Sequence, residues 1–436
     1  MFEKYKIKLK NIVKKKFLLN YIYVFLGQNI ISILNMFILS IMIKIIGLNK
    51  NGEFILIQSY IFLISDLFNM QTFNGVIKFM SRNNRFNDNG IGYAKAGYLL
   101  DLITGISAFA IAVLFLKYYM NFMNISSNIF LISKIYLLII IFRNVSLGSA
   151  TGVLRYYDKY NKIVNINLLF SIIKLILLII VYYNNNHQLI IIIFIELIIE
   201  ICTQFALIYV SFKEIKIQEN KSIFKYKYSI TKEFLGFNLY NCIVTTIDLL
   251  LGNVTNILIG KYLGDSSVSI LRILEKIGGL FSKFTIPFNQ IIYPKMCESV
   301  QKSKNKTINL FEKYIKLTTP IGIFILLILY FSYNYWMVFF TKDFYEYKFI
   351  TMFYLFYTLF TAITALIHPL LVAYNLVKYN IKTILILNIV YIILLPFLMS
   401  YLGLFGVVFA RLLQSIGNVI SKYKIILKYG LDNNRR

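Results

Sequence analysis

The sequence has few cysteines and few acidic residues. Its cysteines, Cys202, Cys242 and Cys297, are too few and too widely spaced for a disulfide framework or a metal site. Acidic residues number 19 against 46 Lys and Arg, which gives a formal net charge of +27. The basic residues are spread over many short segments and form no single basic domain, which argues against a nucleic-acid-binding protein. We therefore expect no metal, no cofactor and no nucleic-acid partner.

Long apolar segments fill most of the chain. Hydrophobic residues make up 58% of the sequence and the mean hydropathy is +0.68, which excludes an ordinary soluble domain. Each segment is long enough for a helix across a hydrocarbon core of about 30 Å, whereas the strands of a membrane barrel would be shorter and would alternate. We predict an all-α polytopic membrane protein with twelve transmembrane helices, near 17–46, 54–80, 93–116, 135–154, 162–183, 189–211, 234–263, 268–293, 314–335, 349–374, 383–402 and 404–426.

The charge of the loops predicts the orientation. With the N-terminus placed inside, most basic residues fall in inside loops or at the two ends, and the outside exceptions are Lys44, Lys50, Lys117, Lys134, Lys261, Lys342 and Lys348. By the positive-inside rule, both termini are expected in the cytoplasm. The first span lacks a small-residue cleavage site, so we expect a retained helix and not a signal peptide. The inside charge also favours contact with anionic membrane lipid.

The longest polar interruption predicts two similar halves. Six spans precede it and six follow, so the expected division is an N-terminal half 1–211, a cytoplasmic linker 212–232 and a C-terminal half 233–436. The first and seventh spans also end alike, with Lys44–Gly47 matching Lys261–Gly264. Internal repeats are common in secondary transporters, and six helices per half require a parallel repeat. Outside loops are short and leave no room for a catalytic domain, so no enzyme is expected.

The eighth span carries a stripe of basic residues on one helical face. Arg272, Lys276, Gly279 and Lys283 follow the spacing i, i+4, i+7, i+11, and Glu275 lies beside them. Charges at this depth in the bilayer face protein partners or water, because contact with lipid tails is too costly. We interpret the stripe as an anion-binding face; the alternative is a set of salt bridges to acids on neighbouring helices.

Polar faces on the first, second and seventh spans indicate a shared aqueous cleft between the halves. The alternative is ordinary hydrogen bonding between helices. The residues we expect to contact substrate, in addition to the basic stripe, are Gln28, Asn35, Asn69, Asn241 and Thr245. The carboxyl groups that are candidates for coupling to an ion or proton are Asp66, Asp248 and Glu275.

Other embedded charges are open to two interpretations. Glu196 and Glu200 share a face of the sixth span, and Lys174 lies within the fifth. We favour a structural pair between Lys174 and a glutamate over a proton or ion site. Three further charges, Arg143, Asp101 and Arg411, are compatible with either role.

Several local patterns resemble a known transporter family. The first span ends with IIGLNKNGEFILIQS, the second closes with FNMQTFNGVIKFMSR, the fourth runs into GVLRYYDKYN, and NILIGKYLG is followed by VSILRILEKI and IIYPKM. In order and spacing they are similar to polysaccharide flippases of the O-antigen (Wzx-like) type. These belong to the multidrug/oligosaccharidyl-lipid/polysaccharide exporter superfamily. Arg272 and Pro294 match the family pattern, but Thr255 and Asn256 stand where many relatives have an acid, and Asp248 is the candidate substitute.

The resemblance implies a fold and a function. The fold is two six-helix bundles in a V, as in MATE transporters. The function is export of undecaprenyl-pyrophosphate-linked oligosaccharide across the inner membrane for surface polysaccharide synthesis, driven by membrane potential or by a proton or sodium counter-ion. The alternatives are a drug/cation antiporter, which would need an acidic cleft, and a lipid II flippase, which usually has two further helices. A membrane O-antigen polymerase would be an enzyme with a large outside loop.

Overall fold

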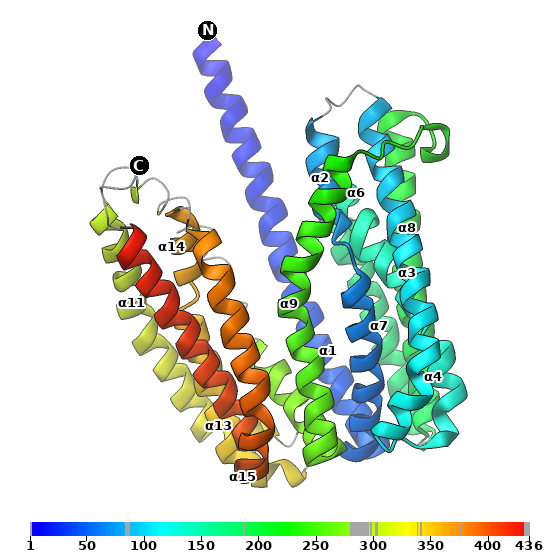
Figure 1. Cartoon of the computed structure of the whole chain (residues 1–436), viewed down its shortest axis with the longest axis vertical. Helices are drawn as coiled ribbons and strands as arrows, with labels where there is room; N and C mark the ends of the chain where they lie inside the picture. The colour runs from blue at the N-terminus through cyan, green and yellow to red at the C-terminus, as the bar shows by residue number, and fades with distance from the viewer. Residues whose placement is uncertain are drawn as a thin grey trace. The chain divides into compact units, whose positions relative to one another are not determined.

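The chain is helical throughout its described part. The structure is a computed structural model that describes residues 2–82, 88–185, 188–279, 296, 299–300, 304–337, 339–340, 342–374 and 376–430. Every regular element in these ranges is a helix (Figure 1). Eight helical segments within them are long and apolar enough to cross a membrane. The predicted class, an all-α polytopic membrane protein, is confirmed.

Two of the eight segments each contain two of the predicted spans, separated at a glycine. Gly47 lies inside the segment Ile22–Ser81 with φ 77°, and Gly403 lies inside Lys382–Lys428 with φ 56°. A positive φ is accessible to glycine without a steric cost. Gly264 has φ 83° at the end of the seventh predicted span. Gly47 and Gly264 are the two glycines matched in the sequence, and both have a positive φ. The repeat itself stays a prediction.

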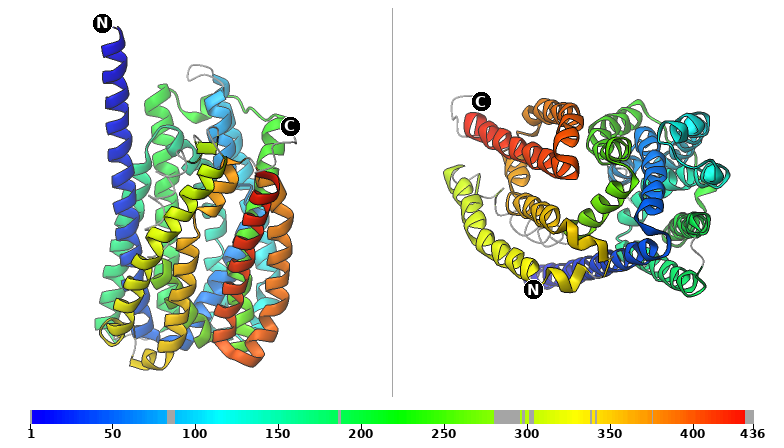
Figure 2. Two further views of the ribbon diagram at one scale, coloured as in Figure 1. Left: turned by 90° about the vertical axis from the view of Figure 1, so that its left-hand side faces the viewer. Right: turned by 90° about the horizontal axis from the view of Figure 1, so that it is seen from below.

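The helices group into two compact units, Met1–Ile257 and Leu258–Arg436, and within each unit they run side by side (Figures 1 and 2). The first unit contains α1 (Phe2–Phe68), α2 (Thr72–Arg82), α3 (Asp88–Phe122), η1 (Ser127–Ile129), α4 (Phe130–Tyr136), α5 (Ile139–Val145), η2 (Ser146–Ala150), α6 (Thr151–Tyr156), α7 (Tyr160–Tyr183), α8 (Leu189–Glu219), η3 (Ile223–Lys225) and most of α9 (Lys232–Leu263). The division of the sequence into equivalent halves at 212–232 stays a prediction.

Two predicted spans of the first unit are interrupted helices. The span expected over 54–80 stops at Phe68 and restarts at Thr72, and Gln71 between them has φ 51°. The span expected over 135–154 contains the π-helical turn η2, in which Gly148 has ψ −110°. Hydropathy reports the length of an apolar segment but not a break inside it, so these expectations of continuous helices were wrong in this respect.

The segment after α8 is folded against the first unit. α8 continues eight residues into the predicted linker, to Glu219. Beyond it, Lys95 on α3 donates to the carbonyl oxygens of Phe224 at 3.0 Å and Tyr226 at 2.8 Å. The side chains of Ile223 and Tyr226 are buried in the core beside α2, α3 and α8. The linker therefore adds to the core of this unit.

The second unit contains the end of α9 and then a helical segment over 265–279. Its further helices are α11 (Lys304–Phe331), α12 (Tyr333–Met337), η4 (Lys342–Tyr347), α13 (Lys348–Ile363), α14 (Ile367–Ala373), α15 (Val377–Ile425) and η5 (Ile426–Gly430). One core joins α11, α14 and η5 through Phe311, Leu370, Leu371 and Ile426, and Val419 and Tyr423 of α15 pack against it.

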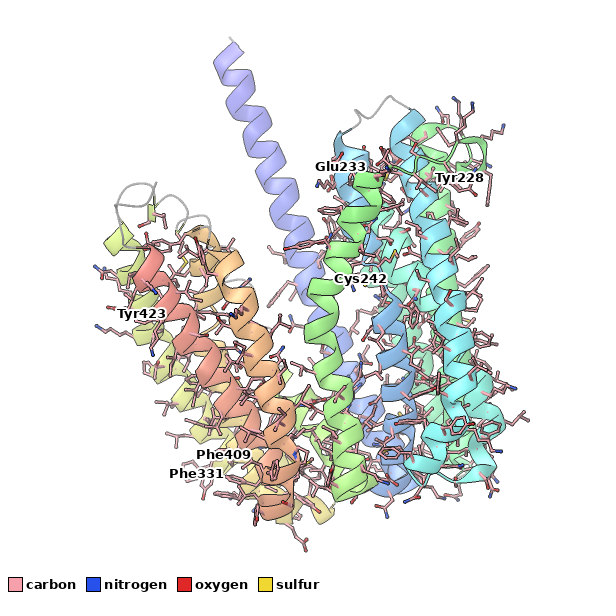
Figure 3. The ribbon with its side chains drawn as sticks, in the orientation of Figure 1. Tyr228, Glu233, Cys242, Phe331, Phe409 and Tyr423 are labelled. Carbon is pink, nitrogen blue, oxygen red and sulfur yellow. The ribbon has the colours of Figure 1, made fainter. Side chains whose placement is uncertain are left out.

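Apolar side chains also cover outward faces of the helices. On α7, Leu169 is 54% exposed and Ile176 is 51% exposed, and Phe331 at the end of α11 is 76% exposed (Figure 3). Exposed apolar surface of this extent is too costly in water, whereas in a bilayer it contacts lipid tails. The buried cores and these apolar faces together explain why the sequence is apolar almost throughout.

Candidate functional site

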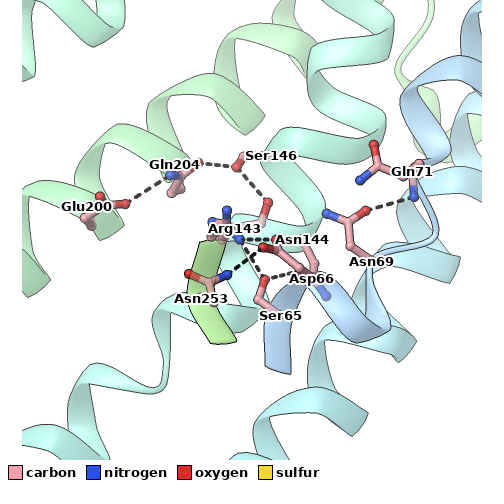
Figure 4. Close-up of polar contacts among 10 residues, drawn as sticks. All are labelled: Ser65, Asp66, Asn69, Gln71, Arg143, Asn144, Ser146, Glu200, Gln204 and Asn253. Atoms are coloured by element: carbon pink, nitrogen blue, oxygen red, sulfur yellow. Dashed lines mark hydrogen bonds and ion pairs between the residues drawn. The ribbon is translucent and has the colours of Figure 1, made fainter. Parts of the chain in front are cut away.

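Asp66, near the end of α1, is the centre of a polar network in the first unit (Figure 4). Its Oδ1 is 3.0 Å from Arg143 Nη1, and its Oδ2 accepts a hydrogen bond from Asn253 Nδ2 at 3.2 Å. Arg143 also donates to the Ser65 hydroxyl at 3.1 Å, and that hydroxyl donates to Asn144 Oδ1 at 2.7 Å. A buried ion pair is stable only when further hydrogen bonds offset its lost hydration, and this network supplies them. It links α1, α5 and α9.

A second polar group in the first unit contains two glutamates of α8. Lys174 on α7 forms an ion pair with Glu196, whose Oε1 also accepts from Gln58 Nε2 at 3.2 Å. The predicted pair between Lys174 and a glutamate is confirmed. Glu200, one turn further along, accepts from Gln204 Nε2 at 3.2 Å (Figure 4).

Asp101 on α3 joins the two helix breaks of the first unit. Its carboxylate oxygens both lie 2.7 Å from the Thr72 hydroxyl, at the start of α2. Its Oδ2 accepts from the backbone N–H of Ser149 at 2.8 Å and from the Ser149 hydroxyl at 2.6 Å, inside the π turn. A Cβ atom on Gly148 would lie 2.4 Å from Oδ2 of Asp101 and 2.5 Å from the Thr72 hydroxyl. The Asp101 carboxylate thus accepts hydrogen bonds at both breaks: from a hydroxyl at the first, and from a hydroxyl and a backbone N–H at the second.

Glu275 lies between two arginines in the second unit. Its Oε1 is 2.8 Å from Arg411 Nη2 on α15, and its Oε2 is 3.4 Å from Arg272 Nη1 on its own helix. The side chain of Arg411 is 13% exposed, whereas that of Arg272 is 32% exposed. We refer to Arg272, Glu275 and Arg411 as the arginine cluster. It holds two positive charges and one negative charge.

The structure places the predicted polar residues of the first and second spans in different surroundings. Asn69 is buried, and its Oδ1 accepts the backbone N–H of Gln71 at 2.9 Å, which stabilises the break between α1 and α2. Asn35 is half-buried. Gln28 is exposed, and its backbone carbonyl oxygen accepts a hydrogen bond from the Ser32 hydroxyl at 2.8 Å. Asn69 therefore has a local structural role in addition to any contact with substrate.

The residues predicted on the seventh and eighth spans are only partly described. Lys276 and Asn241 are half-buried. The side chains of Thr245 and Asp248, and the whole of Lys283, lie outside the described residues. The substrate and ion-coupling assignments to these positions stay predictions.

Sequence reasoning missed several partners in these clusters. Asn253, Asn144 and Ser149 were not singled out, and the partner of Arg411 was left open. Each is a polar residue inside an apolar span, which was the available signal. The missing information was which helices are neighbours. No group of three or more His, Cys, Asp or Glu that could hold a metal occurs among the described residues.

Comparison with known proteins defines the fold class. No protein-family model matches the sequence, and no curated protein matches it. Among solved structures, the chain is similar to a multidrug resistance MATE family transporter of the MOP superfamily in an inward-facing conformation. The TM-score is 0.71 at 15% identity, covering 92% of this chain and 96% of the other.

Two further structures extend the comparison. The lipid II flippase MurJ in an inward closed conformation gives a TM-score of 0.70 at 18% identity, covering 95% of this chain and 90% of that chain. The eukaryotic MATE transporter AtDTX14 gives 0.56 at 10% identity, covering 96% and 97%. This chain is therefore a multi-pass membrane protein with the MATE-type fold. At these identities the likeness establishes the fold alone.

Proposed function

We propose that this protein is a flippase that exports undecaprenyl-pyrophosphate-linked oligosaccharide across the bacterial inner membrane by alternating access. The similarity in fold to MATE transporters and to a lipid II flippase supports a transporter of the MOP superfamily. The motifs that resemble polysaccharide flippases favour a lipid-linked glycan as the cargo. The basic loops favour cytoplasmic termini and contact with anionic inner-leaflet lipid.

The arginine cluster is the observation that carries this proposal. Two guanidinium groups share one carboxylate within apolar helices, so the cluster keeps one positive charge in excess. An uncompensated charge in a membrane protein is costly unless a ligand or water meets it. A diphosphate supplies the missing negative charge, and a guanidinium binds phosphate oxygens through two parallel hydrogen bonds. Lys276 and Lys283 extend the same helical face and are proposed to line the path of the anion.

The membrane potential provides a driving force for this cargo. Moving an anion outward is favoured by an inside-negative potential, by about 2.3 kcal/mol per charge per 100 mV. The alternative driving force is a proton or sodium counter-ion bound at Asp66, Asp248 or Glu275. Asp66 and Glu275 are held in ion pairs with Arg143 and Arg411, so such coupling would have to break a pair.

A drug/cation antiporter is the second candidate, because acids outnumber bases in the buried polar networks of the first unit. These networks contain Asp66, Asp101, Glu196 and Glu200 against Arg143 and Lys174. A lipophilic cation would be drawn to such a region. The excess positive charge of the second unit favours an anionic cargo instead.

Binding to the purified protein in nanodiscs tests the proposal. The probes are undecaprenyl pyrophosphate, undecaprenyl monophosphate and a lipophilic cationic dye. We expect the pyrophosphate to bind most tightly and Arg272→Ala to weaken its binding about 10- to 100-fold, the value of a charge-assisted hydrogen bond. The matched control is Lys313→Ala, which removes an exposed positive charge from α11. Equal affinity of wild type and Arg272→Ala for the pyrophosphate, or tight binding of the dye alone, would overturn the proposal.

A further inference from the structure

We infer that Arg411 is a positioning residue: it occupies Glu275 and so keeps the guanidinium of Arg272 available to an anionic ligand. This inference rests on the proposed function, because it explains how the cluster that is proposed to bind a diphosphate remains able to do so.

The two arginines are held by Glu275 to different degrees. The Arg411 contact, at 2.8 Å, is a charge-assisted hydrogen bond of ordinary length. The Arg272 contact, at 3.4 Å, exceeds the usual N–H···O range of about 2.7–3.2 Å and is weak. Glu275 is therefore bound mainly by the arginine that comes from another helix, although Arg272 is its neighbour at i−3.

Arg411 is more enclosed by protein than Arg272. The side chain of Arg411 is 13% exposed. One turn further along α15, Gln414 Nε2 donates to Asn388 Oδ1 at 2.8 Å, which fastens the part of the helix after Gly403 to the part before it. Arg272 has nearly a third of its side chain exposed, and Glu275 is its one hydrogen-bond partner among the described residues.

The charges of the arginine cluster predict the effect of removing Arg411. With Arg411 present, the carboxylate is neutralised and Arg272 supplies the excess positive charge. Without Arg411, Arg272 is the remaining ion-pair partner of Glu275 among the described residues. The attraction between the two charges, which little water screens at this depth, would then shorten their contact. Arg272 and Glu275 would then form a neutral pair that competes with the ligand. Removing Glu275 as well would release Arg272 again.

The expected recovery of binding when Glu275 is also removed gives a test that distinguishes a positioning role of Arg411 from direct binding. Undecaprenyl pyrophosphate binding is measured in nanodiscs for wild type, Arg411→Ala, Arg411→Ala with Glu275→Gln, and the latter with Arg272→Ala. We expect Arg411→Ala to weaken binding by about tenfold or more, and Glu275→Gln to recover most of that loss in the double variant. The recovered binding must disappear when Arg272→Ala is added. Arg411→Lys should fall between wild type and Arg411→Ala, because it keeps the charge but loses the second nitrogen.

Each contrary result has a defined meaning. No loss of binding in Arg411→Ala overturns the inference. A loss that Glu275→Gln does not recover also overturns it, and makes Arg411 a direct ligand or a folding residue; monodispersity on size exclusion distinguishes those two. If Arg272→Ala alone leaves binding unchanged, the proposed function fails instead.

Discussion

The junction around Asp101 should be a major source of stability in the first unit. Asp101→Ala removes the acceptor for one backbone N–H and two hydroxyl groups, at 2.6–2.8 Å in the structure. The hydroxyls of Thr72 and Ser149 lie 3.3 Å apart and can partly satisfy each other. The backbone N–H of Ser149 has no such substitute.

The expected loss follows from the number of donors left without a partner. A buried unsatisfied donor costs about 1–3 kcal/mol, so one N–H and one hydroxyl together cost about 3 kcal/mol or more. For a unit of this size, roughly 2 °C per kcal/mol gives a fall of about 6 °C in melting temperature. The melting temperature of Asp101→Asn should fall by less than half as much. Its side-chain carbonyl oxygen still accepts from Ser149, and its amide group donates to Thr72.

Thermal unfolding in detergent, followed by the fraction that stays monodisperse on size exclusion, measures these values. Gly148→Ala should also destabilise, by about 1–3 kcal/mol, because its Cβ would crowd the carboxylate of Asp101. Glu312→Ala, at an exposed acid on α11, is the matched control and should change little. If Asp101→Ala melts with the wild type, the carboxylate does not stabilise the two breaks and this reasoning is refuted.

Two further predictions concern the first unit. Arg143→Ala should lower the yield of folded protein, because it leaves the carboxylate of Asp66 buried without its cation. The expected loss in free energy of unfolding is about 3–5 kcal/mol. Adding Asp66→Asn should restore most of that yield, and a double variant as unstable as Arg143→Ala would contradict the assignment of the pair. In a cysteine-free background, a membrane-impermeant thiol reagent should label Lys225→Cys only from the cytoplasmic side and Asn128→Cys only from outside. Labelling of both from one side would contradict the twelve-helix topology.

The sequence was sufficient to predict the helical class and most of the spans. Apolar length alone locates helices in a membrane protein, because every backbone hydrogen bond has to be satisfied inside the segment. The glycines matched at the ends of the first and seventh spans, Gly47 and Gly264, both adopt a positive φ, of 77° and 83°. This part of the fold is local, so it can be derived from local patterns.

Neither the helix breaks nor the partners of the buried charges could be predicted from the sequence. The interruption at 69–71 and the π turn at 146–150 lie inside spans that were expected to be single helices. Asp101, on a third helix, hydrogen-bonds to residues at both breaks, and such a tertiary contact cannot be derived from local sequence. In the same way, helical spacing placed Arg272 and Glu275 together, but the contact with Arg411 joins positions 136 residues apart.

The direct test of the proposed function is translocation of a fluorescent undecaprenyl-pyrophosphate-linked oligosaccharide in proteoliposomes with an imposed inside-negative potential. Wild type should move the probe to the outer leaflet, and the Arg272→Glu, Lys276→Glu variant should not exceed protein-free vesicles. Lys313→Glu, which changes charge at an exposed site, should translocate like wild type. Translocation at the wild-type rate by a well-folded Arg272→Glu, Lys276→Glu protein would contradict the account.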